Sequence, residues 1–145
     1  MTQSLWARAP LPAMGGPCWR WRVSSVAQLP RTRADARARV DGDSRPGLDA
    51  GAVEQMILAF DELLSNGLRH GDLPVEADIT STPRGWLIDI KDTARHRPPA
   101  PAVGRDPAFG GLGLVLVARL AVAHGWFADA RCKHVWAYLP CQLSG

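Results

Sequence analysis

Cysteine is scarce in this sequence, and the positions of its cysteines exclude two common kinds of small domain. Cys18, Cys132 and Cys141 show no paired spacing and have no histidine at ligand spacing. The sequence therefore predicts neither a structural zinc site nor a disulfide framework. An odd number of free thiols is typical of a reducing compartment, so we expect a cytoplasmic protein.

Long apolar runs and familiar phosphate-binding motifs are also missing. The longest apolar run, residues 112–122, contains Arg119 and is too short to span a bilayer. Pro10, Pro12 and Pro17 interrupt the first residues, so no signal peptide is predicted. No Gly-Lys-Ser/Thr follows a glycine run, and the dinucleotide-binding fingerprint is absent. These absences exclude a membrane span, a P-loop and a dinucleotide-binding fold.

Lysine is nearly absent, with two of the 17 basic residues, and positive charge is unevenly placed. Residues 1–47 carry eight Arg against three Asp, whereas residues 48–145 carry nine basic and eleven acidic groups. The body is not basic enough to predict nucleic-acid binding. The basic end either contacts an acidic partner or is a solvated arm. Residues 1–18, rich in Pro and without periodicity, are predicted to be a disordered arm before one domain at 19–145.

Hydrophobic periodicity predicts alternating helices and hairpins along this domain. The expected elements are a strand at 19–26, a helix at 31–41, a long helix from Asp49 as N-cap to His70, strands at 75–82 and 86–91, a loop at 93–110, a helix at 111–124, and strands at 126–131 and 134–139. Gly71 follows the long helix at the C′ position. This order predicts an α+β two-layer sandwich, with helices packed on one face of a mixed, mostly antiparallel sheet.

The long helix carries an acid and an amide on its polar side. Glu62 and Asn66 are four residues apart, about one turn, so their side chains project as neighbours. Asn is a poor mid-helix residue because its side chain competes for backbone hydrogen bonds. A carboxylate beside an amide oxygen suits a hard cation and an acid/base step, although a solvated helix face is the alternative.

Two further features follow along the chain. Asp92 ends a predicted strand, where a carboxylate can accept a hydrogen bond from a purine amine or simply start a turn. Gly110, Gly111 and Gly113 open the next predicted helix, where backbone N–H groups can approach an anion. The alternative for this run is a flexible loop end.

The order of these motifs identifies a resemblance that no single motif carries. Glu-x-x-x-Asn on a helix, Asp after a hairpin strand, a Pro/Gly loop, Gly-Gly-x-Gly-Leu opening a helix and a final hairpin ending in Trp136-x-x-Leu139-Pro140 follow one another. Over about residues 20–140 the chain resembles the GHKL superfamily of histidine-kinase-like ATPases. It is most similar to small anti-sigma-factor serine/threonine kinases and related actinobacterial ATP-binding regulators. The resemblance implies the Bergerat-type ATP-binding fold.

The resemblance also implies a role for each site residue. Asn66 would hold Mg²⁺ at the ATP phosphates, and Glu62 would activate the attacking hydroxyl or water. Asp92 would bind the adenine amine, and His134 stands where the family has a Thr that helps to seat adenine. Residues 93–110 would form the lid over ATP. The remaining predicted cofactor-binding residues are Arg69 and His70 near the phosphates and Gly111, Leu112, Gly113 and Leu114 at the helix start.

Two functions stay open from the sequence. One is a kinase that transfers the ATP γ-phosphate to a partner protein, with a sigma factor or an anti-sigma-factor antagonist as partner. The resemblance also implies a homodimer. The alternative is a nucleotide-binding or sigma-factor-binding module with little catalysis. It is favoured by Thr93-Ala94-Arg95-His96 after Asp92, where the family has glycines, and by His134.

Overall fold

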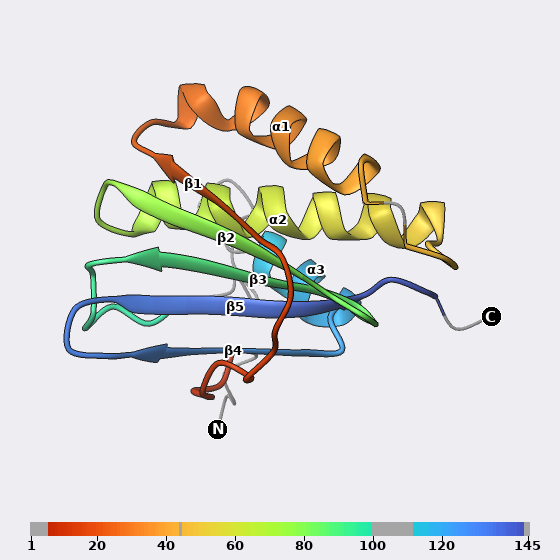
Figure 1. Cartoon of the computed structure of the whole chain (residues 1–145). Coiled ribbons are helices and arrows are strands. Elements are labelled where there is room, and N and C mark those ends of the chain that lie inside the picture. Colours follow the sequence, from red (N-terminus) through yellow and green to blue (C-terminus); the bar gives the residue numbers. More distant parts are fainter. Residues whose placement is uncertain (1–5, 44, 100–111, 144–145) are drawn as a thin grey trace.

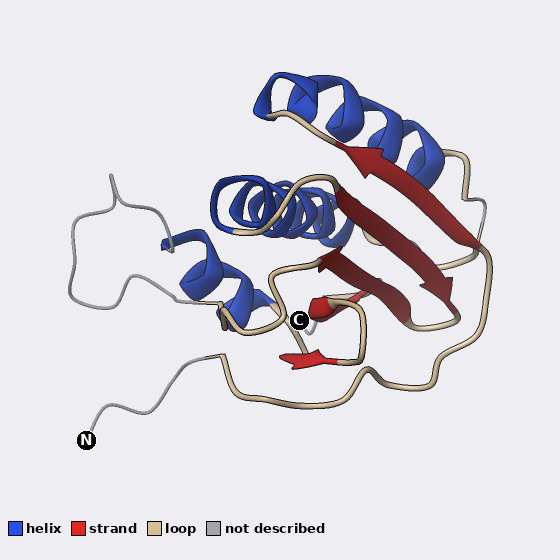
Figure 2. Ribbon diagram, turned by 90° about the vertical axis from the view of Figure 1, so that its left-hand side faces the viewer, coloured by secondary structure: helices blue, strands red, loops and turns tan. Residues whose placement is uncertain are grey.

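The computed structural model places five strands in one open sheet and all helices on one of its faces (Figures 1 and 2). It describes residues 6–43, 45–99 and 112–143. The elements are β1 (Cys18–Val23), the short 3-10 helix η1 (Val26–Gln28), α1 (Leu29–Asp41), α2 (Ala50–His70), β2 (Val75–Thr82), β3 (Gly85–Asp92), α3 (Leu112–Leu120), β4 (Ala123–Ala128) and β5 (Lys133–Pro140). The strand order is β1-β2-β3-β5-β4, and every neighbouring pair is antiparallel. The predicted α+β two-layer architecture is confirmed.

The central helix α2 forms because its sequence supplies both a cap and an apolar stripe. The Asp49 side chain accepts a hydrogen bond from the Gly51 N–H, as expected of an N-cap. The apolar stripe packs against the sheet, with Met56, Phe60 and Leu64 fully buried. On the sheet side, Ile88 and Ile90 are equally buried. This core fixes the polar side of α2 against the N-terminal end of α3.

The helix predicted for residues 111–124 is too long. In the structure α3 ends at Leu120, and residues 123–128 form the edge strand β4. Val122 N–H donates to the Tyr138 carbonyl and so begins the pairing of this strand with β5. His124, the last residue of the predicted helix, lies within β4 with its ring 4.5 Å from that of Trp6.

The described part of the N-terminal arm lies along the sheet. The Ala9 N–H donates to the Trp126 carbonyl, and the Trp126 N–H donates to the Ala7 carbonyl, so the arm pairs with the edge of β4. Trp6 is buried, and its indole N–H donates to the Gly125 carbonyl at 2.8 Å. The arm then crosses the face that the helices leave open and enters β1 (Figure 2). No helix in the described residues has the length and apolar character needed to cross a membrane.

Candidate functional site

The polar side of α2 meets the beginning of α3, and this contact brings two predicted motifs together. Glu62 and Asn66 are both half-buried on α2. A Cβ added to Gly113 would lie 2.0 Å from Glu62 Oε2 and 2.8 Å from Glu62 Cδ. A side chain at residue 113 would displace the Glu62 carboxylate, so glycine lets α3 and this carboxylate lie in contact. The glycine motif and the helix motif, distant in sequence, are therefore in direct contact.

Burial governs the acidity of Glu62. It raises the pKa of this carboxyl above the ordinary value, and the charge of Asp61 adds to the effect, while Arg69 opposes it. A carboxyl whose pKa is raised toward neutrality is a better proton acceptor than an ordinary surface Glu. Position and pKa together suit Glu62 to the role of general base.

The structure describes only some of the other residues predicted near the phosphates. Arg69 and His70 are exposed in the last turn of α2, and the His70 carbonyl accepts a hydrogen bond from Arg97 at 2.6 Å. Leu114 is a core residue, 1% exposed, so only its backbone can take part in binding. Leu112 is the first residue of α3, and Gly111 lies outside the described residues, as does most of the predicted lid.

Asp92 lies at the end of β3, but its carboxylate is enclosed by the protein. It is 3% exposed, and its Oδ1 accepts the Ala94 N–H at 2.7 Å. A Cβ at Gly71 would lie 2.5 Å from Asp92 Oδ2. Gly71 has a φ of −92°, so it is required here for its lack of a side chain rather than for a left-handed cap.

His134 does not join this site. Register pairs it with Lys91 on the face of the sheet away from the helices, whereas Asp92 pairs with Lys133. His134 Nδ1 lies 3.0 Å from Asp89 Oδ2, and Nε2 lies 2.9 Å from Asp129 Oδ2. The predicted adenine contact from His134 is thus corrected. The residue that faces Asp92 is Lys133, which lies between the strands predicted at 126–131 and 134–139.

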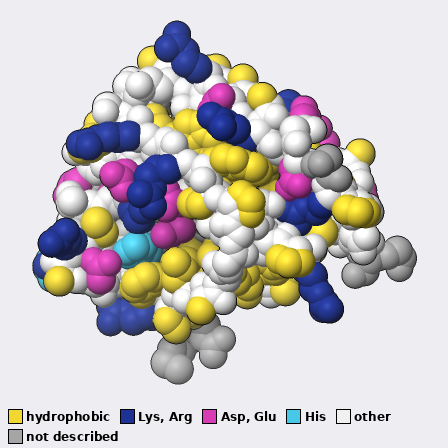
Figure 3. All heavy atoms as spheres, viewed as in Figure 1, with side chains coloured by type: hydrophobic (Ala, Val, Ile, Leu, Met, Phe, Trp, Pro, Cys, Tyr) yellow, Lys and Arg dark blue, Asp and Glu magenta, His cyan; other side chains and the backbone are white. Residues whose placement is uncertain are grey.

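The surroundings of His134 form a charged cluster on the open face of the sheet. Burial alone lowers the pKa of His134, but hydrogen bonds and charge from Asp89 and Asp129 outweigh burial and raise it. Its ring stacks on Phe127 with centroids 4.3 Å apart. Figure 3 shows acidic and basic side chains gathered around a histidine on this face. The cluster continues through Lys91, whose ammonium lies 3.0 Å from Asp78.

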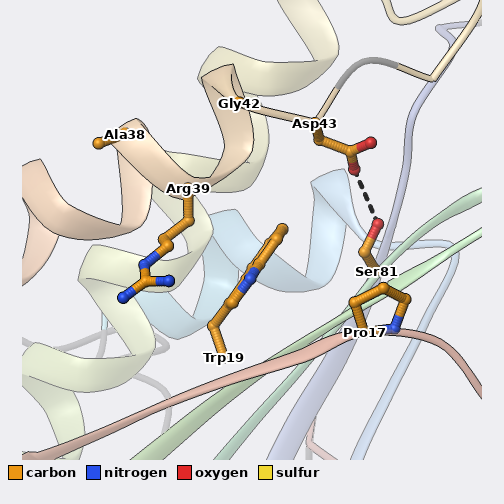
Figure 4. Close-up of a pocket in the computed structure, with 7 residues that line it drawn as sticks. All are labelled: Pro17, Trp19, Ala38, Arg39, Gly42, Asp43 and Ser81. Carbon is orange, nitrogen blue, oxygen red and sulfur yellow. Dashed lines mark hydrogen bonds between the residues drawn. The ribbon is translucent and has the colours of Figure 1, made fainter.

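A separate cleft of about 450 Å³ opens at the other end of β2 (Figure 4). It is lined by Pro17, Trp19, Ala38, Arg39, Gly42, Asp43 and Ser81. Ser81 donates a hydrogen bond to Asp43 at 2.8 Å, and Arg45 also pairs with that carboxylate. The Asp43 carboxylate of this cleft therefore already has a hydrogen bond and an ion pair within the chain. None of the predicted site residues lines it.

The comparisons with known proteins agree with this arrangement at the level of the family. The sequence model of the family described as histidine kinase-like ATPase domain matches residues 23–139. This range contains α2, Asp92 and α3, and it begins after the N-terminal arm. The search of curated proteins found no match.

Proposed function

Because the chain belongs to the histidine kinase-like ATPase family, we propose that it binds ATP with Mg²⁺ where α2 meets α3. The observation that carries this proposal is the contact between Gly113 and the Glu62 carboxylate. It brings the N-terminal turn of α3, where backbone N–H groups point along the helix axis, to a half-buried acid that is one helical turn from Asn66. Phosphoryl transfer depends on such positioning and charge neutralisation more than on covalent chemistry by the protein.

The side chains at this contact fit a magnesium–phosphate ligand. In the described ranges no three His, Cys, Asp or Glu side chains come together as a ready metal cage. Mg²⁺ in nucleotide sites uses few protein oxygens and takes the rest from phosphates and water. The Asn66 carboxamide would supply one such oxygen. When bound, the ion neutralises phosphate charge, which is its contribution to the chemistry.

The finer proposal is that the chain is a serine/threonine kinase for a partner protein. Glu62 would accept the proton of the partner's hydroxyl as that oxygen attacks the γ-phosphorus. The bond from the γ-phosphorus to the bridging oxygen then breaks, and ADP leaves. By resemblance, the partner would be a sigma-factor regulator in a homodimeric cytoplasmic system. The raised pKa of Glu62 supports the base role.

A second function is favoured by the enclosure of Asp92. An acid that already accepts the Ala94 N–H and lies beside Lys133 is poorly placed to read adenine. A nucleotide-binding module with weak catalysis would still hold the phosphates at α3. The two functions share the phosphate contacts and differ in phosphate transfer.

Thermal unfolding with ATP and Mg²⁺ tests the shared part. A ligand at 100 times its Kd stabilises the folded state by about 2.7 kcal/mol, so the melting temperature should rise. In Asn66→Ala the rise should no longer depend on Mg²⁺. Glu54→Gln, a change on α2 at an acid that pairs with Arg37, is the matched control and should behave as wild type. An unchanged melting temperature at millimolar ATP rejects the proposal.

Labelled ATP with a candidate partner then separates the two functions. Glu62→Gln should bind ATP as wild type does and lose phosphate transfer. Equal transfer by wild type and Glu62→Gln would exclude Glu62 as the base. Binding without transfer in both proteins would support the module.

A further inference from the structure

The buried ammonium of Lys133 lies where an amine should approach Asp92. Lys133 begins β5 directly opposite Asp92 in the β3–β5 register. It is 4% exposed, and its Nζ lies 3.5 Å from Asp92 Oδ2. Lysine is almost never so buried unless it is paired, and the charge partner of Lys133 here is the Asp92 carboxylate.

The rest of the Asp92 carboxylate is also engaged by the chain. Oδ1 accepts the Ala94 N–H at 2.7 Å and lies 3.4 Å from the Asp72 nitrogen. The backbone at Gly71 covers Oδ2. Among the residues that the structure describes, these contacts leave Asp92 only 3% exposed.

Three further hydrogen bonds fasten the segment that covers this corner. Lys133 Nζ donates to the Arg97 carbonyl at 2.8 Å. The Arg97 guanidinium donates to the His70 carbonyl at 2.6 Å and to Asp72 Oδ1 at 3.1 Å. Lys133 thus links the end of β3, the following segment and, through Arg97, the end of α2.

We propose that Lys133 is an internal ligand of Asp92 that takes the place of the exocyclic amine of a nucleotide base. The ammonium and the buried carboxylate lie 3.5 Å apart as an ion pair, and an adenine amine, which is neutral and brings no charge, does not displace the ammonium. The ligand class of this site is then a Mg²⁺-bound triphosphate, held with little regard to the base. The inference rests on the proposed phosphate site and adds the residue that sets base selectivity.

Calorimetry on the full chain tests this inference with four ligands in Mg²⁺: ATP, GTP, CTP and ribose 5-triphosphate, which has no base. Wild type should bind all four with Kd values within about threefold. Lys133→Thr should bind ATP about tenfold more tightly than ribose 5-triphosphate, because one recovered hydrogen bond supplies about that factor in affinity. Lys91→Thr, at the other lysine of the chain, is the matched control and should keep the wild-type pattern.

The outcomes test the inference on Lys133 and the proposed function separately. Wild type that binds ATP tenfold tighter than ribose 5-triphosphate overturns the inference and leaves the phosphate site standing. Wild type that binds none of the four overturns the proposed function, and the inference with it. If Lys133→Thr folds but binds ATP no more tightly than ribose 5-triphosphate, the inference is also overturned. If circular dichroism shows that Lys133→Thr does not fold, Lys133→Met, which keeps the apolar stem, replaces it, and the wild-type comparison decides by itself.

Discussion

The contact between Gly113 and Glu62 predicts a substitution whose effect on stability reverses sign with its neighbour. In Gly113→Ala the new methyl group would lie 2.0 Å from Glu62 Oε2 and 3.2 Å from Glu62 Cβ. The carboxylate, at the free end of the side chain, must therefore swing away. The Cβ contact is less severe and needs a shift of only a few tenths of an ångström.

The magnitude follows from two opposing effects. Ala is favoured over Gly inside a helix by up to about 1 kcal/mol. Overpacking a filled site costs about 1–3 kcal/mol. With Glu62 present, we expect Gly113→Ala to lower the free energy of unfolding by about 0–2 kcal/mol. In a Glu62→Ala background most of the clash is gone, so the same substitution should stabilise by up to about 1 kcal/mol.

Urea denaturation of wild type, the two single variants and the double variant measures this coupling. We expect a coupling energy of about 1–3 kcal/mol, well above the 0.3–0.5 kcal/mol or so within which independent sites add. The control cycle pairs Gly113→Ala with Glu54→Ala, because Glu54 pairs with Arg37 and not with α3. Additivity in the Glu62 cycle would refute the approach of α3 to Glu62, and with it the observation that carries the proposed function.

Two further predictions concern the arm and the open face of the sheet. Trp6→Ala should lower the free energy of unfolding by about 3–5 kcal/mol in urea, because the indole is buried against β4. Met14→Ala, in the exposed part of the same arm, should change the free energy of unfolding little. If Trp6→Ala has an equally small effect, the arm does not pack against the sheet. The raised pKa of His134 means that its pairs with Asp89 and Asp129 contribute fully below its ordinary pKa and fade as pH rises through the folded value. Unfolding free energies of wild type and His134→Gln should therefore differ most below the ordinary pKa of 6.5 and less as pH rises above it, and a difference independent of pH would contradict the charged pairing.

Short sequence patterns predicted the elements whose formation depends on residues close together in the sequence. Residues 50–70 form α2 because one stripe of apolar residues and the Asp49 cap lie within a single segment. The β2–β3 hairpin was equally accessible, since both strands alternate and a Pro-Arg-Gly turn joins them. The sequence also indicated the neighbouring positions of Glu62 and Asn66, which follow from helical geometry alone.

The errors arose where distant segments decide the outcome. Residues 121–124 have apolar character that suits a helix, yet they leave it because β5 and the N-terminal arm pair with β4. No local pattern reveals that Trp6 packs on His124. Similarly, Gly71 resembles a helix C-cap, but its lack of a side chain is required by Asp92, which comes 21 positions later.

The predicted strand begins at residue 134, whereas β5 begins at residue 133. This difference decides which side chain faces Asp92. Side chains alternate between the faces of a strand, so beginning β5 at residue 133 turns His134 away and turns Lys133 toward Asp92. The same ion pair that occupies the acid also helps to fix this register, since a shift by one residue would turn Lys133 to the open face and leave the buried Asp92 carboxylate without its cation. The phosphate side, built on α2 and α3, shares no residue with this pair. The proposed phosphate site and the proposed loss of base recognition therefore rest on different side chains, and although hydrogen bonds of Arg97 connect Lys133 to the end of α2, substitutions at Asn66 and at Lys133 test the two proposals separately.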